Sequence, residues 1–190
     1  MVRRGGVACG AGSSAKIRLM AYPQQLLIPM REDLTRYGVL ETRTPADVDR
    51  VLAENGTVLM VVNSVCGCAA GKARPGVGMA LQHAVRPDVA ATVFAGGDDA
   101  ATAHVRGILS AYPPSSPSIA LFQNGKPVYM MHRSDIEPRD AFQISRLLTD
   151  AGFEVNRATA LSPEPEILGP ALFLASATRV EPKLNGVHKN

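Results

Sequence analysis

The sequence predicts an α/β domain built on a mixed central β-sheet. Two apolar runs without polar alternation, at residues 57–62 and 89–95, are typical of buried parallel strands. Two more runs, at residues 118–122 and 127–131, are joined by a connection that contains an Asn-Gly pair, which favours an antiparallel hairpin. Apolar residues make up 46% of the 190-residue chain and charged residues 19%, which suits a packed core and argues against global disorder.

The length of the chain favours one domain. We expect this domain over residues 21–155, between an N-terminal tail over residues 1–20 and a C-terminal extension over residues 156–190. The tail is rich in glycine and serine without a periodic pattern, and Met20 is an alternative start of the chain. The extension holds several prolines around an apolar patch, and the sequence leaves open whether it is disordered or docks on the domain.

The first half of the domain opens with a helix that is predicted from about Gln24 to Gly38. Its apolar stripe has spacings of three and four residues and consists of Leu27, Met30, Leu34 and Tyr37. A short strand is expected at residues 39–42. The pair Thr44-Pro45 is typical of an N-cap and a first helical residue, and it predicts a second helix as far as about Glu54.

The second half begins after the buried strand at residues 57–62, with a helix that extends towards Ala84. Pro75 must kink or interrupt this helix, because proline lacks a backbone N–H group. After the strand at residues 89–95, an aspartate caps a helix that runs to about Leu109. The hairpin follows, and Pro138 opens a final helix. Four apolar side chains of that helix are expected to face the sheet: Phe142, Ile144, Leu147 and Leu148.

This order of helices and strands predicts a thioredoxin-like three-layer sandwich with an antiparallel C-terminal hairpin and an extra N-terminal helix. Right-handed crossovers place the segment after residues 57–62 at the carboxyl edge of a central strand. Ligands of open α/β sheets bind at this edge, so a functional site is expected there.

Cys66-Gly67-Cys68 lies in that segment. A strand that delivers two close thiols to the start of a helix is typical of a thiol–disulfide active site. The thiolate is the attacking species, and the free N–H groups and positive dipole end of a helix N-terminus favour it at Cys66. Residues two apart on a regular helix point to opposite sides, so a bridge requires non-helical backbone at the motif, for which Gly67 gives freedom.

The neighbouring residues have two interpretations each. Asn63 and Ser64 either orient the loop by hydrogen bonds or merely form the turn. Lys72 and Arg74 either favour a thiolate or an anionic thiol ligand, or they lie solvated on a helix surface. Cys9, in the tail, is interpreted as incidental rather than as a third redox thiol.

Three sequence runs extend the cysteine motif. They are Val-Val-Asn-Ser-Val-Cys-Gly-Cys-Ala-Ala-Gly at 61–71, followed by Ala-Arg-Pro at 73–75, then Thr-Val-Phe-Ala-Gly at 92–96 and Pro-Ser-Ser-Pro-Ser at 114–118. Together these runs resemble the bacilliredoxin family over about residues 21–155. The resemblance implies that Cys66 is the nucleophile, that Cys68 is its partner, and that Pro117 is a cis-proline against the active site.

The resemblance also implies an activity. Bacilliredoxins remove bacillithiol from mixed disulfides on proteins, and some show disulfide isomerase activity. We therefore expect a thiol–disulfide oxidoreductase with no bound cofactor, which uses bacillithiol or a similar low-molecular-weight thiol as co-substrate. Its expected partners are thiolated client proteins and either that thiol or a reductase.

Other classes of function fit the sequence less well. The net charge is +3 without a block of basic residues, and aromatic residues are only 5%, so neither a nucleic-acid groove nor a membrane-binding surface is indicated. A metal or iron–sulfur carrier stays an alternative use of the cysteines, although His83, His104 and His132 show no ligand spacing to the pair. Three cysteines are too few for a secreted disulfide scaffold, which favours a cytoplasmic location.

Overall fold

The computed structural model of the chain describes residues 22–53 and 56–161, with side chains as far as Gly152. The expectations for the N-terminal tail with Cys9, and for residues 162–190, lie outside this part. Five strands form one sheet: β1 (Leu40–Glu41), β2 (Thr57–Asn63), β3 (Val89–Phe94), β4 (Ser118–Gln123) and β5 (Lys126–Met131). The helical elements are α1 (Gln24–Thr35), α2 (Pro45–Leu52), η1 (Ala69–Ala73), α3 (Arg74–Ala80), α4 (Asp99–Ile108), α5 (Arg133–Ile136) and α6 (Ala141–Leu161).

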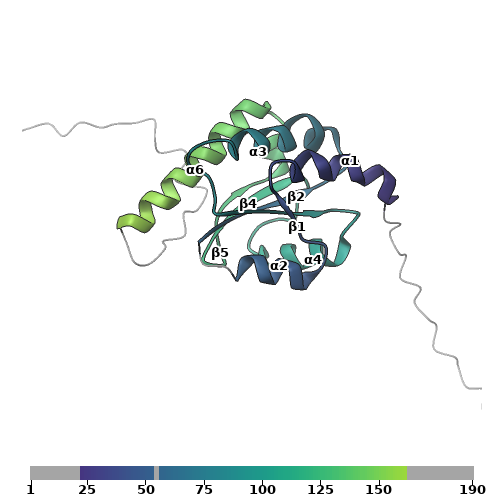
Figure 1. The fold of residues 1–190 in the computed structure, drawn as a ribbon, viewed down its shortest axis with the longest axis horizontal. Helices are drawn as coiled ribbons and strands as arrows, with labels where there is room; N and C mark the ends of the chain where they lie inside the picture. Colours follow the sequence, from purple (N-terminus) through teal and green to yellow (C-terminus); the bar gives the residue numbers. More distant parts are fainter. Residues whose placement is uncertain (1–21, 54–55, 162–190) are drawn as a thin grey trace, which may run out of the picture.

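The sheet is mixed, as predicted, with the strand order β1-β3-β2-β4-β5. The β1–β3 and β2–β3 pairs are parallel, whereas β2–β4 and β4–β5 are antiparallel. Helices α1, α3 and α6 lie over one face of the sheet, and α2 and α4 cover the other (Figure 1). This three-layer arrangement, which ends in a hairpin and a helix, is the thioredoxin-like fold that the element order predicted.

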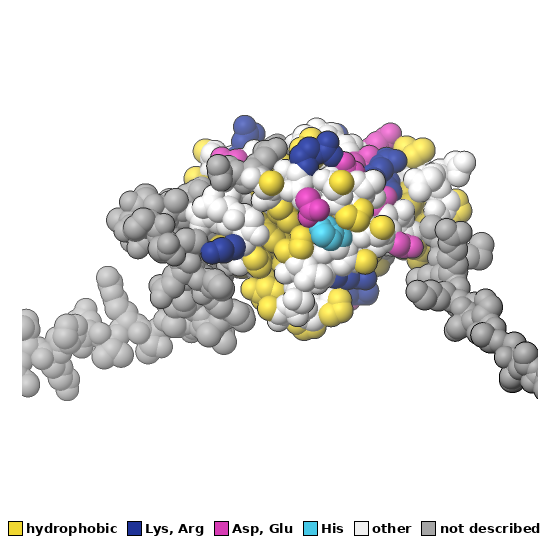
Figure 2. All heavy atoms as spheres, turned by 90° about the horizontal axis from the view of Figure 1, so that it is seen from below, with side chains coloured by type: hydrophobic (Ala, Val, Ile, Leu, Met, Phe, Trp, Pro, Cys, Tyr) yellow, Lys and Arg dark blue, Asp and Glu magenta, His cyan; other side chains and the backbone are white. Residues whose placement is uncertain are grey.

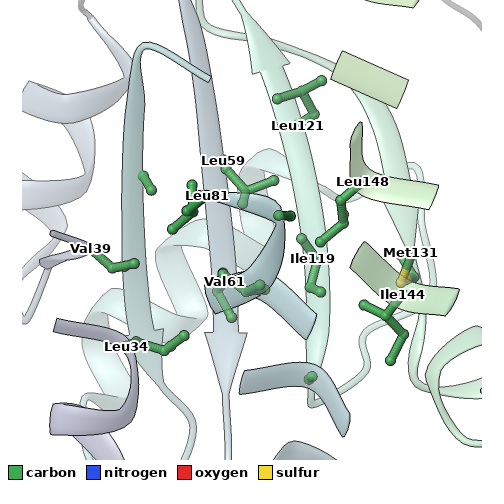
Figure 3. Close-up of a cluster of buried hydrophobic side chains, with 14 of the residues drawn as sticks. Leu34, Val39, Leu59, Val61, Leu81, Ile119, Leu121, Met131, Ile144 and Leu148 are labelled. Atoms are coloured by element: carbon green, nitrogen blue, oxygen red, sulfur yellow. The ribbon is translucent and has the colours of Figure 1, made fainter. Parts of the chain in front are cut away.

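Strand β2 is the centre of the core, because all seven of its residues are buried. Leu59 and Val61 belong to the buried apolar cluster between the sheet and the helices α3 and α6. Figure 3 shows this cluster, in which Ile119 and Ile144 are their neighbours. Val58, Met60 and Val62 point the other way, to the cluster under α2 and α4. A strand that is apolar on both faces fits only between two helical layers, which explains why its sequence does not alternate.

Local sequence signals place the ends of several elements. The Thr44 side chain accepts a hydrogen bond from the Asp47 N–H group, and the Asp47 side chain accepts one from the Thr44 N–H group, which forms a capping box at the start of α2. The β4–β5 turn contains Asn124 at φ 49° and Gly125 at φ 75°. Both central residues of such a tight turn need positive φ, which Asn-Gly supplies at the lowest cost.

The helix after the cysteines differs from the prediction. A π-helical turn, η1, leads into α3, and the Arg74 N–H group binds the Ala69 carbonyl five residues back. This wider turn accommodates Pro75, which has no N–H group and lies in the first turn of α3. The helix also ends at Ala80 instead of near Ala84.

The last helix also differs from the prediction. A short helix, α5, follows β5, and α6 begins at Ala141 instead of at Pro138. Asp140 and Gln143 explain this start, since each side chain accepts a hydrogen bond from the backbone N–H group of the other. Phe142 is 59% exposed and does not face the sheet. It lies two residues before the buried Ile144, and residues two apart on a helix point in different directions.

The surface over α2 and α4 is mixed in character. Figure 2 views the molecule from this side, and acidic and basic side chains are scattered there among hydrophobic ones. Within the described residues, no helix is long and apolar enough to cross a membrane.

Candidate active site

Three segments of the chain meet at one edge of the sheet. Strand β2 ends at Asn63, and in its antiparallel register with β4 residue Val62 lies opposite Ser118. Strand β5 reaches the same edge, because Met131 pairs with Ile119. The cysteine loop after β2, the residues before β4 and the residues after β5 are therefore neighbours.

The backbone turns into a helix at Cys66. Its carbonyl oxygen accepts hydrogen bonds of 3.1 Å from the N–H groups of both Ala69 and Ala70. Cys66 thus precedes the helix, whereas Cys68 has helical dihedral angles of φ −68° and ψ −29°. The helix boundary falls inside the motif, which gives the non-helical backbone that the one-residue spacing requires.

The two sulfurs face each other as free thiols. The Sγ atoms of Cys66 and Cys68 lie 2.7 Å apart, and either thiol is able to donate a hydrogen bond to the other. In this dithiol the φ of Gly67 is outside the left-handed range, and a Cβ atom there would meet nothing within 4 Å. The backbone freedom that a Cys66–Cys68 bridge requires of Gly67 stays a prediction, because the two thiols are free here. Gly67 is exposed, so the absence of a side chain leaves both sulfurs open to approach.

The pKa of the Cys66 thiol is lowered. Partial burial opposes ionisation, but hydrogen bonds from Cys68, Ser64 and the Ala69 N–H group outweigh it, together with the positive charge of Arg133. The Ser64 Oγ donates to Cys66 Sγ at 3.2 Å, and the Ala69 N–H group donates at 3.4 Å. This arrangement favours the thiolate at Cys66, the species that attacks a disulfide.

The pKa of the Cys68 thiol moves in the opposite direction. Burial raises it, as do the hydrogen bond to Cys66 and the negative charge that Cys66 carries when ionised, while Arg133 opposes the rise. The two neighbouring cysteines therefore differ: the surroundings favour the thiolate at Cys66 and the protonated thiol at Cys68.

A network of buried polar side chains holds the backbone of the cysteine loop. Arg74, only 3% exposed, donates to Asn63 Oδ1 at 3.2 Å and to the Ser64 carbonyl oxygen at 3.0 Å. Its Nε also pairs with Asp33 of α1 at 3.0 Å. Asn63 donates to the Met30 carbonyl at 3.3 Å and accepts from the Ser64 N–H group at 2.8 Å. The interpretation of Arg74 as a solvated side chain is therefore wrong, and its contacts are with the loop backbone and Asp33.

Comparison with known proteins identifies the family. A family model described as disulphide isomerase matches residues 22–155. A bacilliredoxin of Koribacter versatilis is 54% identical over 140 residues, which cover 73% of this chain and 97% of that protein. A bacilliredoxin of Salinibacter ruber is 52% identical over 135 residues, which cover 70% of this chain and 78% of that protein. The chain belongs to the bacilliredoxin family.

Bacilliredoxins are thiol oxidoreductases, so the family agrees with a site built from two thiols. Among solved structures, a variant thioredoxin of Halobacterium salinarum is 19% identical, with a TM-score of 0.43 over 63% of this chain and 92% of that chain.

Pro117 follows a cis peptide bond, as the bacilliredoxin resemblance implied. It is buried and directly precedes Ser118, which pairs with Val62 at the end of β2 that carries the cysteine loop. A local hydrogen bond spans this proline, because Ser118 Oγ donates to the Ser115 carbonyl oxygen at 3.0 Å. Pro117 thus lies at the active edge of this bacilliredoxin, and its role in supporting the site stays a prediction.

Arg133 is a site residue that the sequence interpretation missed. It is the first residue of α5, and its charge acts on both Cys66 and Cys68. The sequence held no direct signal, because Arg133 is 65 residues from Cys68 and the short helix α5 was not predicted. The register of the hairpin was the available clue, since it brings the end of β5 to the edge where β2 ends.

The metal-carrier alternative for this bacilliredoxin finds no support in the ligand geometry. Nowhere in the described part of the chain do three His, Cys, Asp or Glu side chains gather closely enough to hold a metal ion. His104 Nε2 is instead 2.6 Å from Asp49 Oδ1, and the His132 ring lies tilted against the Tyr112 ring with 5.9 Å between the centroids.

Proposed function

We propose that this chain is a thiol–disulfide oxidoreductase that removes a low-molecular-weight thiol, bacillithiol or a similar one, from mixed disulfides on client proteins. The observation that carries the proposal is the hydrogen bonding of the dithiol. The Cys66 sulfur lies 2.7 Å from the Cys68 sulfur and accepts from Ser64 Oγ and the Ala69 N–H group, which lowers the pKa of Cys66, while the pKa of Cys68 is raised. Membership of the bacilliredoxin family supports the choice of reaction. No bound cofactor is needed, because the two thiols supply both electrons.

In the first step, the Cys66 thiolate attacks the sulfur that belongs to the small thiol. A disulfide forms between Cys66 and the small thiol, the original mixed disulfide breaks, and the client leaves as a thiolate that takes up a proton. Hydrogen bonds from Ser64 Oγ and the Ala69 N–H group hold the Cys66 sulfur in place for this attack.

In the second step, Cys68 attacks the Cys66 sulfur. The capture of the small thiol removes the negative charge that held the pKa of Cys68 up, so Cys68 releases its proton more readily. A Cys66–Cys68 disulfide forms and the small thiol leaves. Two further small thiols, which leave joined as their own disulfide, or a reductase then return two electrons to restore the dithiol. The helix boundary inside the motif lets the two sulfurs meet despite the one-residue spacer.

Intact-mass spectrometry of the Cys68→Ala variant tests the proposal. After exposure to a bacillithiolated client protein, this variant is expected to gain the mass of the small thiol on Cys66, while the client returns to its reduced mass. A Cys66→Ala/Cys68→Ala double variant is the control and is expected to gain nothing. An unmodified Cys66 in the Cys68→Ala variant would contradict the mechanism, and an adduct only from a glutathionylated client would change the identity of the thiol.

Disulfide isomerisation is the second candidate function, and the description of the matching family model favours it. An isomerase needs the same Cys66 thiolate but a client disulfide in place of a mixed disulfide. Reactivation of a scrambled disulfide protein, without any dethiolation in the assay above, would move the assignment to this activity. Either activity suits a cytoplasmic location, where the dithiol is kept reduced.

A further inference from the structure

Arg133 is anchored beside the segment that leads to Pro117. Its backbone N–H group donates to Ser115 Oγ at 3.4 Å, and Ser115 lies two residues before the cis-proline. The register of β4 with β2 and of β5 with β4 brings this pair to the same edge of the sheet as the cysteine loop. The sheet therefore brings Arg133, at the start of α5, to the edge that carries the dithiol.

The Arg133 guanidinium group has donors available for a ligand. Its Nε pairs with Glu137 Oε1 at 2.7 Å, and its two Nη groups make no hydrogen bond within the described residues. The side chain is 47% exposed, so it is open to a molecule that approaches the sulfurs. An exposed ion pair such as Arg133–Glu137 is weak and exchanges easily for another carboxylate.

A second basic side chain contacts this region. Lys72 Nζ donates to the Glu137 backbone carbonyl, so Lys72 lies near the Arg133–Glu137 ion pair. The positive charge of Arg133 favours the ionised form of both sulfurs and lowers the pKa of each. When Cys66 is bound in a mixed disulfide, the negative charge of its sulfur is gone, and an anionic group on the captured thiol can replace it.

We propose that Arg133 is a specificity-determining residue that binds a carboxylate of the small thiol in the mixed disulfide. The planar fork of a guanidinium group matches a carboxylate with two parallel hydrogen bonds, which a point charge cannot reproduce. A carboxylate held at Arg133 places the sulfur of the small thiol, and not the sulfur of the client, over Cys66. This inference rests on the proposed function and explains why the attack releases the client.

Rates of adduct formation on Cys66 in the full-length Cys68→Ala variant test this inference. The probes are three symmetric disulfides: dithiodipropionate is anionic, bis(2-hydroxyethyl) disulfide is neutral and cystamine is cationic. The ratio of the anionic rate to the neutral rate is expected to fall by about three- to tenfold when Arg133→Gln is added. Arg133→Lys is expected to keep part of the preference, and added salt is expected to reduce it.

The control is Arg50→Gln on α2, which removes the same charge from an exposed side chain on the opposite face of the sheet. It is expected to leave the ratio unchanged. An equal loss of rate for all three probes in Arg133→Gln would show that Arg133 only supports the thiolate, and it would overturn the inference. Failure of Cys66 to react with any probe would instead contradict the proposed function itself, so the two failures are distinguishable.

Discussion

At the scale of single residues, the Cys66 sulfur is where burial and hydrogen bonding oppose each other. Burial disfavours the thiolate, and three hydrogen-bond donors favour it. Hydrogen bonds to a charged group contribute about 1.5–3 kcal/mol each, whereas desolvation of a thiol that is still partly exposed is incomplete. The hydrogen bonds therefore decide the balance, and the direction of the pKa shift follows from them.

The Ser64→Ala substitution tests this balance. It removes the 3.2 Å hydrogen bond to Cys66 Sγ, so the pKa of Cys66 is expected to rise. A higher pKa means less thiolate at neutral pH, and the alkylation rate by iodoacetamide at pH 7 is expected to fall several-fold. At a pH well above the pKa the two proteins are expected to react at similar rates.

Ser110→Ala is the matched control, because Ser110 is exposed in the segment after α4. It is expected to leave the pH–rate profile unchanged. An identical profile for Ser64→Ala and the unchanged chain would mean that the Ser64 hydroxyl does not act on the sulfur.

Residue roles differed in how far the sequence predicted them. The cysteines were predictable, because two close thiols between a buried strand and a helix are typical of a redox site and rarely serve packing alone. The network of Arg74 was not, since its partners Asp33 and Asn63 are 41 and 11 residues away and only the packing of α1 against α3 brings them together. Arg133 was missed for the same reason: its place depends on the hairpin register.

At the scale of elements, glycine in the helix layer sets how closely two helices approach. A Cβ atom on Gly76 of α3 would lie 2.7 Å from Ile144 Cγ2 and 3.0 Å from the Ala141 carbonyl oxygen, both on α6. Ile144 is fully buried, and backbone cannot yield as a flexible side chain can. The helix that follows the cysteines is thus held against α6 by a contact that only glycine allows.

Gly76→Ala is expected to lower the free energy of unfolding by about 1–3 kcal/mol, because the added methyl group overpacks the contact between α3 and α6. Gly107→Ala is the control, since a Cβ atom at that position in α4 would meet nothing within 4 Å. There the higher helix propensity of alanine is expected to stabilise the protein by up to about 1 kcal/mol. Urea unfolding of both variants measures the difference, and equal midpoints would contradict the contact.

The elements themselves were largely predictable from local signals. The strands β2 to β5 and the helices α1, α2 and α4 were expected within a few residues of their observed ends. Four details were not: the π-helical turn before Pro75, the early end of α3, the short helix α5 and the start of α6. At the π-helical turn and at α6, a backbone or side-chain hydrogen bond sets the boundary, as the bonds of Asp140 and Gln143 do at α6, and the apolar pattern does not reveal such bonds.

At the scale of the whole molecule, α1 ties the active edge of the sheet together. Arg31 of α1 is 4% exposed, and its guanidinium group binds both carboxylate oxygens of the buried Asp98, at 2.8 and 2.9 Å. It also pairs with Glu41 of β1 at 3.0 Å. Asp98 follows β3 and accepts a hydrogen bond from the Phe94 N–H group at 3.0 Å. The helix that precedes the sheet thus links β1 and the end of β3.

The Asp98→Asn substitution tests how much stability this link supplies. The amide has the same shape, but it leaves the buried Arg31 with only the partly exposed Glu41 as a counter-charge. Removing one partner of a buried ion pair costs about 3–5 kcal/mol, a large share of the roughly 5–15 kcal/mol by which a domain is stable. Denaturant unfolding is expected to show a lower midpoint with an unchanged slope.

Asp99→Asn provides the comparison, because the neighbouring Asp99 is exposed in the first turn of α4. It loses only a favourable interaction with the helix dipole, of about 0.3–1 kcal/mol. A similar midpoint for the two variants would mean that the Arg31–Asp98 pair contributes no more to the free energy of unfolding than an exposed charge does. A clear difference would mean that the buried pair between Arg31 of α1 and Asp98 after β3 supplies a substantial part of the stability of the domain.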